Sequence, residues 1–221
     1  CEAYLQNRIP YGNDIHTLGY YLTLAKSGTV DQKTVYNYLN KPINSKSVVE
    51  KIVKMQHTRG PDDQGIWESK CKKVCFGHNR LTIIDLSKNG KQPFISNDEN
   101  FVITFNGEIY NFKEIKKELN AKNIFFKSNT DTEVILEAYK YWGIDFVNRL
   151  RGMFAFAIWD RNKKELFLAR DRFGIKPLYY SRKSEGFYFA SEPKGLFAAG
   201  VERRDNLIAW STYLSFGTYE H

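Results

Sequence analysis

FAFAIWDRNKKELFLARD, residues 154–171, decides the fold class of this 221-residue chain. Two runs rich in aromatic and aliphatic residues, 154–160 and 165–171, flank the polar tetrapeptide RNKK. Two such runs on either side of a short polar turn are typical of a β-hairpin. The sequence therefore predicts an antiparallel sheet in this half of the chain.

Further short strands are predicted on both sides of the hairpin, because β-branched and aromatic residues are enriched there. They are RLTIID (80–85), FVITFN (101–106), PLYYS (177–181) and GFYFAS (186–191). Short strands joined by hairpins, with few helices between them, favour antiparallel sheets covered by helices. The expected fold class is therefore α+β.

Three helices are predicted from the spacing of a capping box, in which a polar N-cap residue is followed three positions later by Glu. The pairs are Ser47 with Glu50, Asn111 with Glu114, and Thr130 with Glu133. Apolar residues at helical spacing follow each pair, as in Val48, Val49, Ile52 and Val53. These helices are expected to cover the sheets.

The composition excludes several function classes. Hydrophobic residues make up 42% of the chain, which is typical of a globular protein. The net charge of +8 raises nucleic acid as a partner, but the Lys and Arg residues are spread among acids and apolar positions, so no nucleic-acid interface is expected. No apolar run is long enough to span a membrane, and the chain does not start with a signal pattern. A cytoplasmic protein without a membrane partner is therefore predicted.

The three cysteines do not make a disulfide framework in a chain of this size. Cys71 and Cys75 have the spacing of half a metal site, but no second Cys or His pair has a matching spacing. Both are predicted to be free thiols, and no metal is expected. Cys1 is different, because a thiol and an α-amine on one residue can form a nucleophile and its base.

FNGEIYN, residues 105–111, is the segment that most directly suggests chemistry. The backbone N–H of Gly107 beside the side-chain amide of Asn106 can direct two donors at one developing oxyanion. The alternative is an ordinary turn from a strand to a helix, and the local chemistry alone favours the turn.

Two charged residues near predicted element ends have the same ambiguity. Arg80 precedes an apolar run, where it is either a surface charge or a fork for a substrate carboxylate. Asp131 lies in the first turn of a predicted helix. There it either complements the helix dipole or binds a substrate ammonium group.

Seven segments in order over residues 57–197 carry a resemblance to one family. They are HTRGPDDQG, GHNRLTIIDLS, FNGEIYN, SNTDTEVILEAYKYWG, RLRGMFAFAIWD, LARDRFGIKPLYY and FASEPKGL. Together they closely resemble the glutaminase (class II glutamine amidotransferase) domain of the glutamine-dependent asparagine synthetases. NLIAWSTYLSFG, 206–217, resembles the linker that leads to an ATP-dependent synthetase domain in that family. Because no SGGxDS-like nucleotide loop follows, the chain is expected to be a fragment or an isolated domain.

The resemblance implies a domain organisation and a fold. Residues 47–204 correspond to the glutaminase domain, 205–221 begin the linker, and 1–46 are an atypical N-terminal segment. The family fold is the four-layer αββα sandwich of antiparallel sheets found in N-terminal nucleophile hydrolases. The implied partners are glutamine, a synthetase domain in cis or in trans, and a second copy in a homodimer. No cofactor is implied for this chain, whereas ATP and Mg²⁺ would serve the synthetase domain.

The resemblance also implies residue roles. A cysteine thiolate attacks the glutamine side-chain amide, with Asn106 and Gly107 matching the oxyanion-hole pair. Arg80 matches the residue that holds the glutamine α-carboxylate, and Asp131 matches the residue that holds its α-ammonium group. The remaining glutamine contacts match Glu108 and the backbone of Leu81, Thr82, Ile83 and Ile84. Water then releases glutamate from the thioester, and ammonia passes to an ATP-activated aspartate or a related carboxylate.

The N-terminus departs from the family pattern Cys-Gly-Ile, because Cys1 is followed by Glu2, Ala3 and Tyr4. The strand and helix that follow the nucleophile in the family match 35–56 best, which places the nucleophile position near 31–33, where there is no thiol. Two hypotheses remain. Either Cys1 is the nucleophile and 6–34 are an insertion, or 1–34 are an extension of a degenerate glutaminase that only binds or scaffolds. The complete set of polar pocket residues favours the first.

Overall fold

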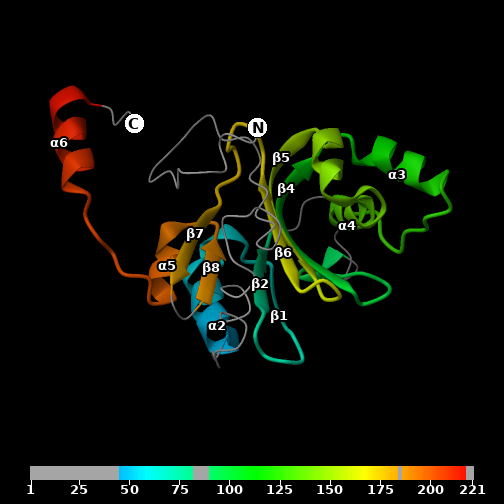
Figure 1. Cartoon of the computed structure of the whole chain (residues 1–221), viewed down its shortest axis with the longest axis horizontal. Coiled ribbons are helices and arrows are strands. Elements are labelled where there is room, and N and C mark those ends of the chain that lie inside the picture. The colour runs from blue at the N-terminus through cyan, green and yellow to red at the C-terminus, as the bar shows by residue number, and fades with distance from the viewer. Residues whose placement is uncertain (1–44, 82–89, 184–185, 218–221) are drawn as a thin grey trace.

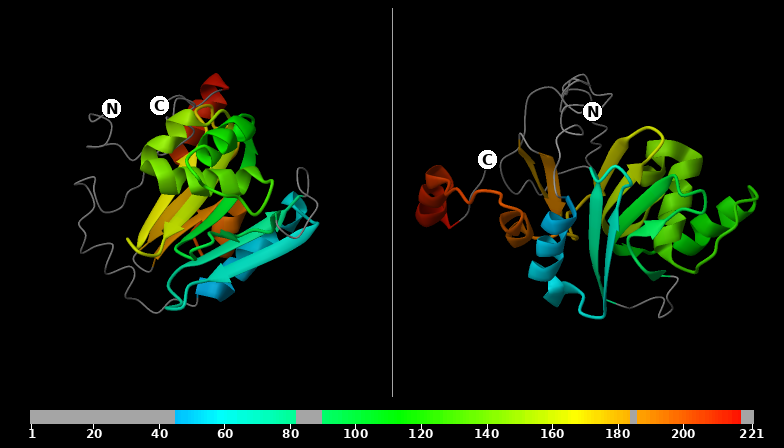
Figure 2. Two further views of the ribbon diagram at one scale, coloured as in Figure 1. Left: turned by 90° about the vertical axis from the view of Figure 1, so that its right-hand side faces the viewer. Right: turned by 90° about the horizontal axis from the view of Figure 1, so that it is seen from below.

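A computed structural model describes residues 45–81, 90–183 and 186–217, and most of them form four layers (Figure 1). Helices α3 (Phe112–Asn120) and α4 (Asp131–Trp142) form one outer layer, and α2 (Ser45–Met55) and α5 (Pro193–Ala198) form the other. Two layers of antiparallel strands lie between them, as the view from below shows (Figure 2). Helix α6 (Leu207–Phe216) lies apart from the four layers.

The sheet next to α3 and α4 has four strands in the order β3-β4-β5-β6. Their bounds are Phe94–Ile95, Phe101–Ile109, Gly152–Asp160 and Glu165–Arg170. Strands β5 and β6 pair antiparallel from Asp160↔Glu165 to Ala155↔Arg170. The predicted hairpin is therefore confirmed.

Strict alternation of side chains in this sheet produces two cores. Odd positions of β4 and even positions of β5 face α3 and α4, where they meet Val134, Ile135 and Phe146. The opposite positions, including Val102, Ala157 and Trp159, face the second strand layer. The sheet is thus buried on both faces, which explains why β5 reads as a nearly continuous apolar run.

The second strand layer consists of two hairpins. Strand β1 (Asp63–Glu68) pairs with β2 (Cys75–Arg80), and β7 (Tyr179–Lys183) pairs with β8 (Gly186–Ala190). Gly77 lets α2 approach β2, because a Cβ atom there would lie 2.4 Å from Val53 Cγ2. The remaining short helices are η2 (His57–Arg59) and η4 (Gly143–Arg149).

The prediction of a strand starting at Arg80 was wrong, since β2 ends at that residue. The buried side chains of this strand are upstream, where Phe76 enters the core between the strand layers. Residues 82–85 of the predicted strand lie outside the described residues, as do Cys1 and the rest of 1–44.

The predicted capping boxes differ from the observed helix starts. Helix α2 begins at Ser45, so Ser47 is inside the helix and is not its N-cap. Asn111 is the N-cap of α3, but its side chain bonds the backbone of Arg149 and Arg151 and does not cap. Local spacing reveals neither that Ser47 lies inside its helix nor that the Asn111 side chain bonds residues far away in the sequence.

Thr130 caps α4 as predicted, with its hydroxyl accepting the Glu133 N–H at 3.3 Å. The carboxylate of Glu133 does not close the box. It accepts instead from the backbone N–H groups of Lys127 (2.9 Å) and Ser128 (2.7 Å). The buried Glu133 therefore fixes the loop that leads into α4.

No helix among residues 45–81, 90–183 and 186–217 has the length and hydropathy needed to cross a membrane.

Asp171 organises the loop after β6 from a buried position. Its carboxylate accepts from the backbone N–H groups of Phe154 (3.2 Å), Phe173 (3.1 Å), Ile175 (2.9 Å) and Lys176 (2.9 Å). One buried side chain thus ties the loop to β5.

We expect Asp171→Ala to lower the free energy of unfolding by about 3 kcal/mol, because it leaves one buried and three partly buried N–H groups without their acceptor. Urea denaturation followed by circular dichroism measures the effect. Asp205→Ala, at an exposed position, is the control and is expected to leave the midpoint unchanged. Equal midpoints for the two variants would contradict the role of Asp171.

Candidate functional site

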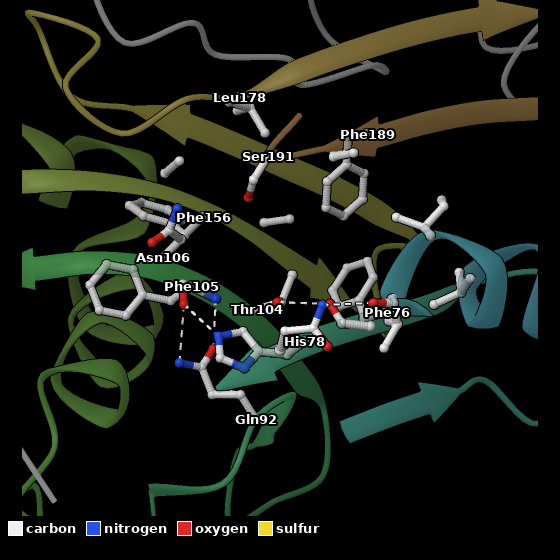
Figure 3. A pocket seen from close by; sticks show the side chains of 18 of the residues that line it. Phe76, His78, Gln92, Thr104, Phe105, Asn106, Phe156, Leu178, Phe189 and Ser191 are labelled. Carbon is white, nitrogen blue, oxygen red and sulfur yellow. Dashed lines mark hydrogen bonds between the residues drawn. The ribbon is translucent and has the colours of Figure 1, made fainter. Parts of the chain in front are cut away.

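A cavity of about 720 Å³ lies where α2, β2, β4, β5, β8 and the first turn of α4 meet. Its walls are mostly apolar, with Phe76, Leu178 and Phe189 among the side chains visible in Figure 3. Its polar lining residues include Asn106 and Glu108 of β4 and Thr130 and Asp131 at the start of α4. An apolar cavity with a few convergent polar groups is the usual form of a small-molecule site.

Asn106 is one of the polar residues that line this cavity (Figure 3). It lies on β4 two positions after Thr104, whose hydroxyl donates to the Gly77 carbonyl in the second strand layer. Alternation along β4 therefore points Asn106 away from α4 and between the strand layers. Its side-chain Nδ2 is buried and has no hydrogen-bond partner among the described residues.

Gly107 has no room for a side chain, because a Cβ atom would lie 2.2 Å from the Met153 carbonyl oxygen of β5. The N–H groups of Phe105 and Ile109 donate to side chains at the β4 edge opposite β5, at 2.7 and 3.1 Å. Since alternate N–H groups of a strand point to the same side, we expect the Gly107 N–H at this edge too. It then lies one residue from the unpaired amide of Asn106.

Asp131 is the first residue of α4 and is buried. Its Oδ2 accepts the N–H of Ile109 at 3.1 Å, which ties the start of α4 to the end of β4. Burial raises the pKa of Asp131 to about 6; the Ile109 bond acts against that shift, whereas the nearby charge of Glu108 adds to it. A carboxylate held this way is stabilised by a bound cation.

Arg80, the last residue of β2, reaches the same end of the cavity. Its guanidinium lies over Gly90, where a Cβ atom would be 2.5 Å from Arg80 Nη2 and 3.4 Å from the Thr130 methyl carbon. Thr130 directly precedes Asp131, so a cation and a buried carboxylate lie near the start of α4. This pair can hold both charges of an amino acid, with the Asn106 amide nearby in the same cavity.

The structure brings most of the sequence-predicted site residues to one cavity. Its lining includes Arg80, Leu81, Asn106, Gly107, Glu108 and Asp131. The other predicted residues, Cys1, Thr82, Ile83 and Ile84, lie outside the described residues. Leu81 is 56% exposed at the rim of the described part of the site.

Two residues at this site were not predicted from the sequence. Gln92 and His78 both bond the backbone of Phe105, directly before Asn106. Burial lowers the pKa of His78 to about 4, so the imidazole is neutral at pH 7. A single His in GHN and a Gln before a Pro carry no local signal of such contacts.

Cys71 and Cys75 are both free thiols in the structure, as predicted. The Ser69 hydroxyl lowers the pKa of the exposed Cys71, whereas burial raises the pKa of Cys75 to about 12. Within the described ranges, no three His, Cys, Asp or Glu side chains are grouped as metal ligands.

Comparison with solved structures confirms the predicted αββα fold. The glutamine phosphoribosylpyrophosphate amidotransferase of Bacillus subtilis, complexed with ADP and GMP, superimposes with a TM-score of 0.60 at 20% sequence identity. The match covers 70% of this chain and 41% of that chain. The structure of the allosteric regulatory enzyme of purine biosynthesis matches with a TM-score of 0.61 at 20% identity, over the same shares of the two chains.

Comparison with curated proteins shows higher identity. Glutamine-hydrolyzing asparagine synthetase 1 of Bacillus subtilis (strain 168) is 43% identical over 173 residues, 78% of this chain and 27% of that protein. Glutamine-hydrolyzing asparagine synthetase 2 of the same organism is 50% identical over 140 residues, 63% of this chain and 18% of that protein. The chain thus spans only about a quarter or less of the length of these two relatives.

The family model described as a glutamine amidotransferase domain matches residues 33–221. This match spans all the described elements and the cavity lined by Arg80, Asn106 and Asp131. This family match covers most of the chain and agrees with the fold and with the similarity to asparagine synthetases. The chain therefore belongs to the glutamine amidotransferase domain family.

Proposed function

We propose that this chain binds glutamine beside Asn106 and hydrolyses its side-chain amide to glutamate and ammonia. The observation that carries the proposal is the buried Nδ2 of Asn106, a donor without a partner among the described residues. A buried unpaired donor is costly and rare in folded proteins. A carbonyl oxygen that becomes an oxyanion in the reaction would accept this hydrogen bond and strengthen it.

The charges around the cavity orient the substrate. The Asp131 carboxylate holds the α-ammonium group, and the Arg80 guanidinium holds the α-carboxylate. Glu108 and the backbone of 81–84 complete the contacts with glutamine. The side-chain amide is then directed towards Asn106 and Gly107, whose N–H groups bind its oxygen.

The chemistry requires a nucleophile, and the proposal assigns Cys1 to this role. The α-amine of Cys1 takes the thiol proton, and the sulfur forms a bond to the amide carbon. The C–N bond then breaks, the amine returns the proton to nitrogen, and ammonia leaves a thioester. Water attacks the thioester, the C–S bond breaks, and glutamate is released with the thiol restored.

The proposal extends to the fate of ammonia. Two relatives named as glutamine-hydrolyzing asparagine synthetases are several times longer than this chain. We infer that ammonia passes to a synthetase domain that uses ATP and Mg²⁺ to amidate aspartate or a related carboxylate. That domain is joined through 205–221 or acts as a separate partner. A cytoplasmic location and a homodimer belong to the same proposal.

A second candidate function is a glutaminase-like domain that binds without hydrolysis. The family match begins at residue 33 and does not include Cys1, so the role of Cys1 is what distinguishes the two functions. In this case the polar residues of the cavity still bind glutamine, but no thiol attacks it.

The first prediction separates these two functions. In the chain prepared with Cys1 as its first residue, we expect Cys1→Ala to abolish glutamate release from glutamine. Cys71→Ala removes an exposed thiol outside the cavity and is expected to retain the activity of the parent. Glutamate release is measured with a coupled dehydrogenase assay.

Equal rates in the parent and in Cys1→Ala would reject Cys1 as the nucleophile. An inactive parent that still binds glutamine in a calorimeter would support the binding function. A parent that neither binds nor hydrolyses glutamine would reject both.

We expect Asn106→Ala to lower kcat by about 10²–10³-fold, with a small change in KM, because the lost donor acts mainly in the transition state. The matched control is Asn120→Ala at the exposed end of α3, which should keep the parent kcat. A loss confined to KM would indicate instead that Asn106 binds the ground state.

Glutamine affinity is expected to depend on pH through Asp131, whose pKa is about 6. The ammonium group binds the ionised carboxylate, so affinity is full above about pH 7 and is lost as the pH falls through 6. Below this value the Kd should rise about tenfold per pH unit, as for a single linked proton. Arg80 and Glu108 are charged groups that line the same cavity.

Calorimetric titration of the Cys1→Ala variant from pH 5 to 8 measures this dependence without turnover. Asp131→Asn is the control, and it should bind weakly at every pH in this range. A Kd of the Cys1→Ala variant that stays constant down to pH 5 would exclude Asp131 as the partner of the ammonium group.

A further inference from the structure

Strand β4 extends well beyond its neighbour β3. The two residues of β3 pair only with Ile103 and Val102, whereas β4 continues to Ile109. Opposite Phe105 the place of a strand neighbour is taken by the side chain of Gln92. Phe105 directly precedes Asn106 and Gly107, the two proposed oxyanion donors.

The Gln92 amide reproduces both hydrogen bonds of a strand neighbour. The Phe105 N–H donates to Gln92 Oε1 at 2.7 Å, and Gln92 Nε2 donates to the Phe105 carbonyl oxygen at 3.1 Å (Figure 3). A primary amide can do this because it carries the same donor and acceptor pair as a peptide group. Gln92 is buried, so both bonds are shielded from competition with water.

Gln92 also connects β4 to α4. Its Nε2 lies 3.4 Å from the Thr132 hydroxyl, in the first turn of the helix that contains Asp131. The backbone of Gln92 is itself closely packed, since a Cβ atom on Gly65 would lie 1.8 Å from the Gln92 carbonyl oxygen. The amide is therefore attached to a part of the fold that leaves little room for movement.

The Phe105 carbonyl oxygen has a second donor in His78, whose Nε2 lies at 3.0 Å. Because the oxygen accepts, Nε2 carries the proton of the neutral imidazole. Two side chains thus fix the carbonyl group of the peptide bond that joins Phe105 to Asn106. Rotation of this peptide would move both Asn106 and the Gly107 N–H.

We propose that Gln92 is a positioning residue of this site, which replaces a missing strand neighbour at Phe105 and thereby aims the Asn106 amide and the Gly107 N–H at the reacting carbonyl. The effect on turnover rests on the proposed function. The effect on Asn106 and Gly107 does not, because it concerns the geometry of β4 alone. Oxyanion donors act over a narrow range of distances, so a small displacement is sufficient to slow the reaction.

The test uses Gln92→Met, which keeps the length of the side chain but removes both hydrogen bonds. Gln92→Glu is the second variant, because at pH 8 it keeps an acceptor for the Phe105 N–H but loses the donor to the carbonyl oxygen. Gln56→Met is the matched control. Gln56 is equally buried, but its Nε2 bonds the Glu192 carbonyl oxygen next to α5.

Nuclear magnetic resonance provides a readout that does not require turnover. In at least one Gln92 variant we expect the Asn106 side-chain and Gly107 backbone amide signals to shift or broaden. The backbone amide signal of Ile158 in β5 should stay unchanged. The control should leave all three signals in place. Unchanged Asn106 and Gly107 signals in both Gln92 variants would overturn the proposal, whether or not the chain hydrolyses glutamine.

Kinetics provide the second readout in an active chain. We expect the Gln92 variants to lower kcat by about 10- to 100-fold, with KM changed much less. If Gln92 acts through Asn106, combining Gln92→Met with Asn106→Ala should cost little more than Asn106→Ala alone. Fully additive losses, or an unchanged kcat in a variant with shifted signals, would overturn the positioning role. An inactive parent would reject the proposed hydrolysis, and the amide signals would still decide the role of Gln92.

Discussion

Strand β4 has to keep its buried backbone paired after β3 ends, and the geometry of the site depends on how it does so. Buried N–H and C=O groups without partners are strongly disfavoured. Opposite Phe105 the partner is the Gln92 amide, and opposite Ile109 it is the Asp131 carboxylate. Gly107 lies midway between these two positions. The side chains that complete the sheet edge are thus the ones that enclose the proposed oxyanion position.

The sequence is sufficient to predict β4, β5 and β6 of the larger sheet and the hairpin of β7 and β8, but not β1 or most of β2. Strands β4, β5 and β6 carry aromatic and β-branched residues at successive positions, which local propensity detects. Strands β1 and β2 each contain a glycine, at Gly65 and Gly77, which weakens the strand signal. Each glycine is needed for a close approach, to Gln92 and to α2 respectively. These requirements arise only in the assembled layers, so no local pattern shows them.

In the candidate site, too, the sequence identifies some residues and misses others. Asn106 and Gly107 are adjacent in the chain, and the resemblance of NGEIYN to one family identifies them, although their local chemistry favours a simple turn. Gln92 and His78 act on Phe105 across 13 and 27 residues of sequence. Their partner is a backbone group, which every residue possesses. No residue type at Phe105 could therefore indicate these contacts.

The first turn of α4 contains two buried acids, Glu133 and Asp131. The hydrogen bonds of Glu133 hold the fold together, whereas Asp131 faces the candidate site. Glu133 accepts from three donors on Lys127 and Ser128, so its carboxylate is bonded within the fold. Asp131 accepts from Ile109, yet burial still raises its pKa to about 6. The unpaired Nδ2 of Asn106 is a second incompletely stabilised group in the same cavity. In the proposed function, the ammonium group of glutamine pairs with Asp131 and its side-chain carbonyl oxygen accepts from Asn106.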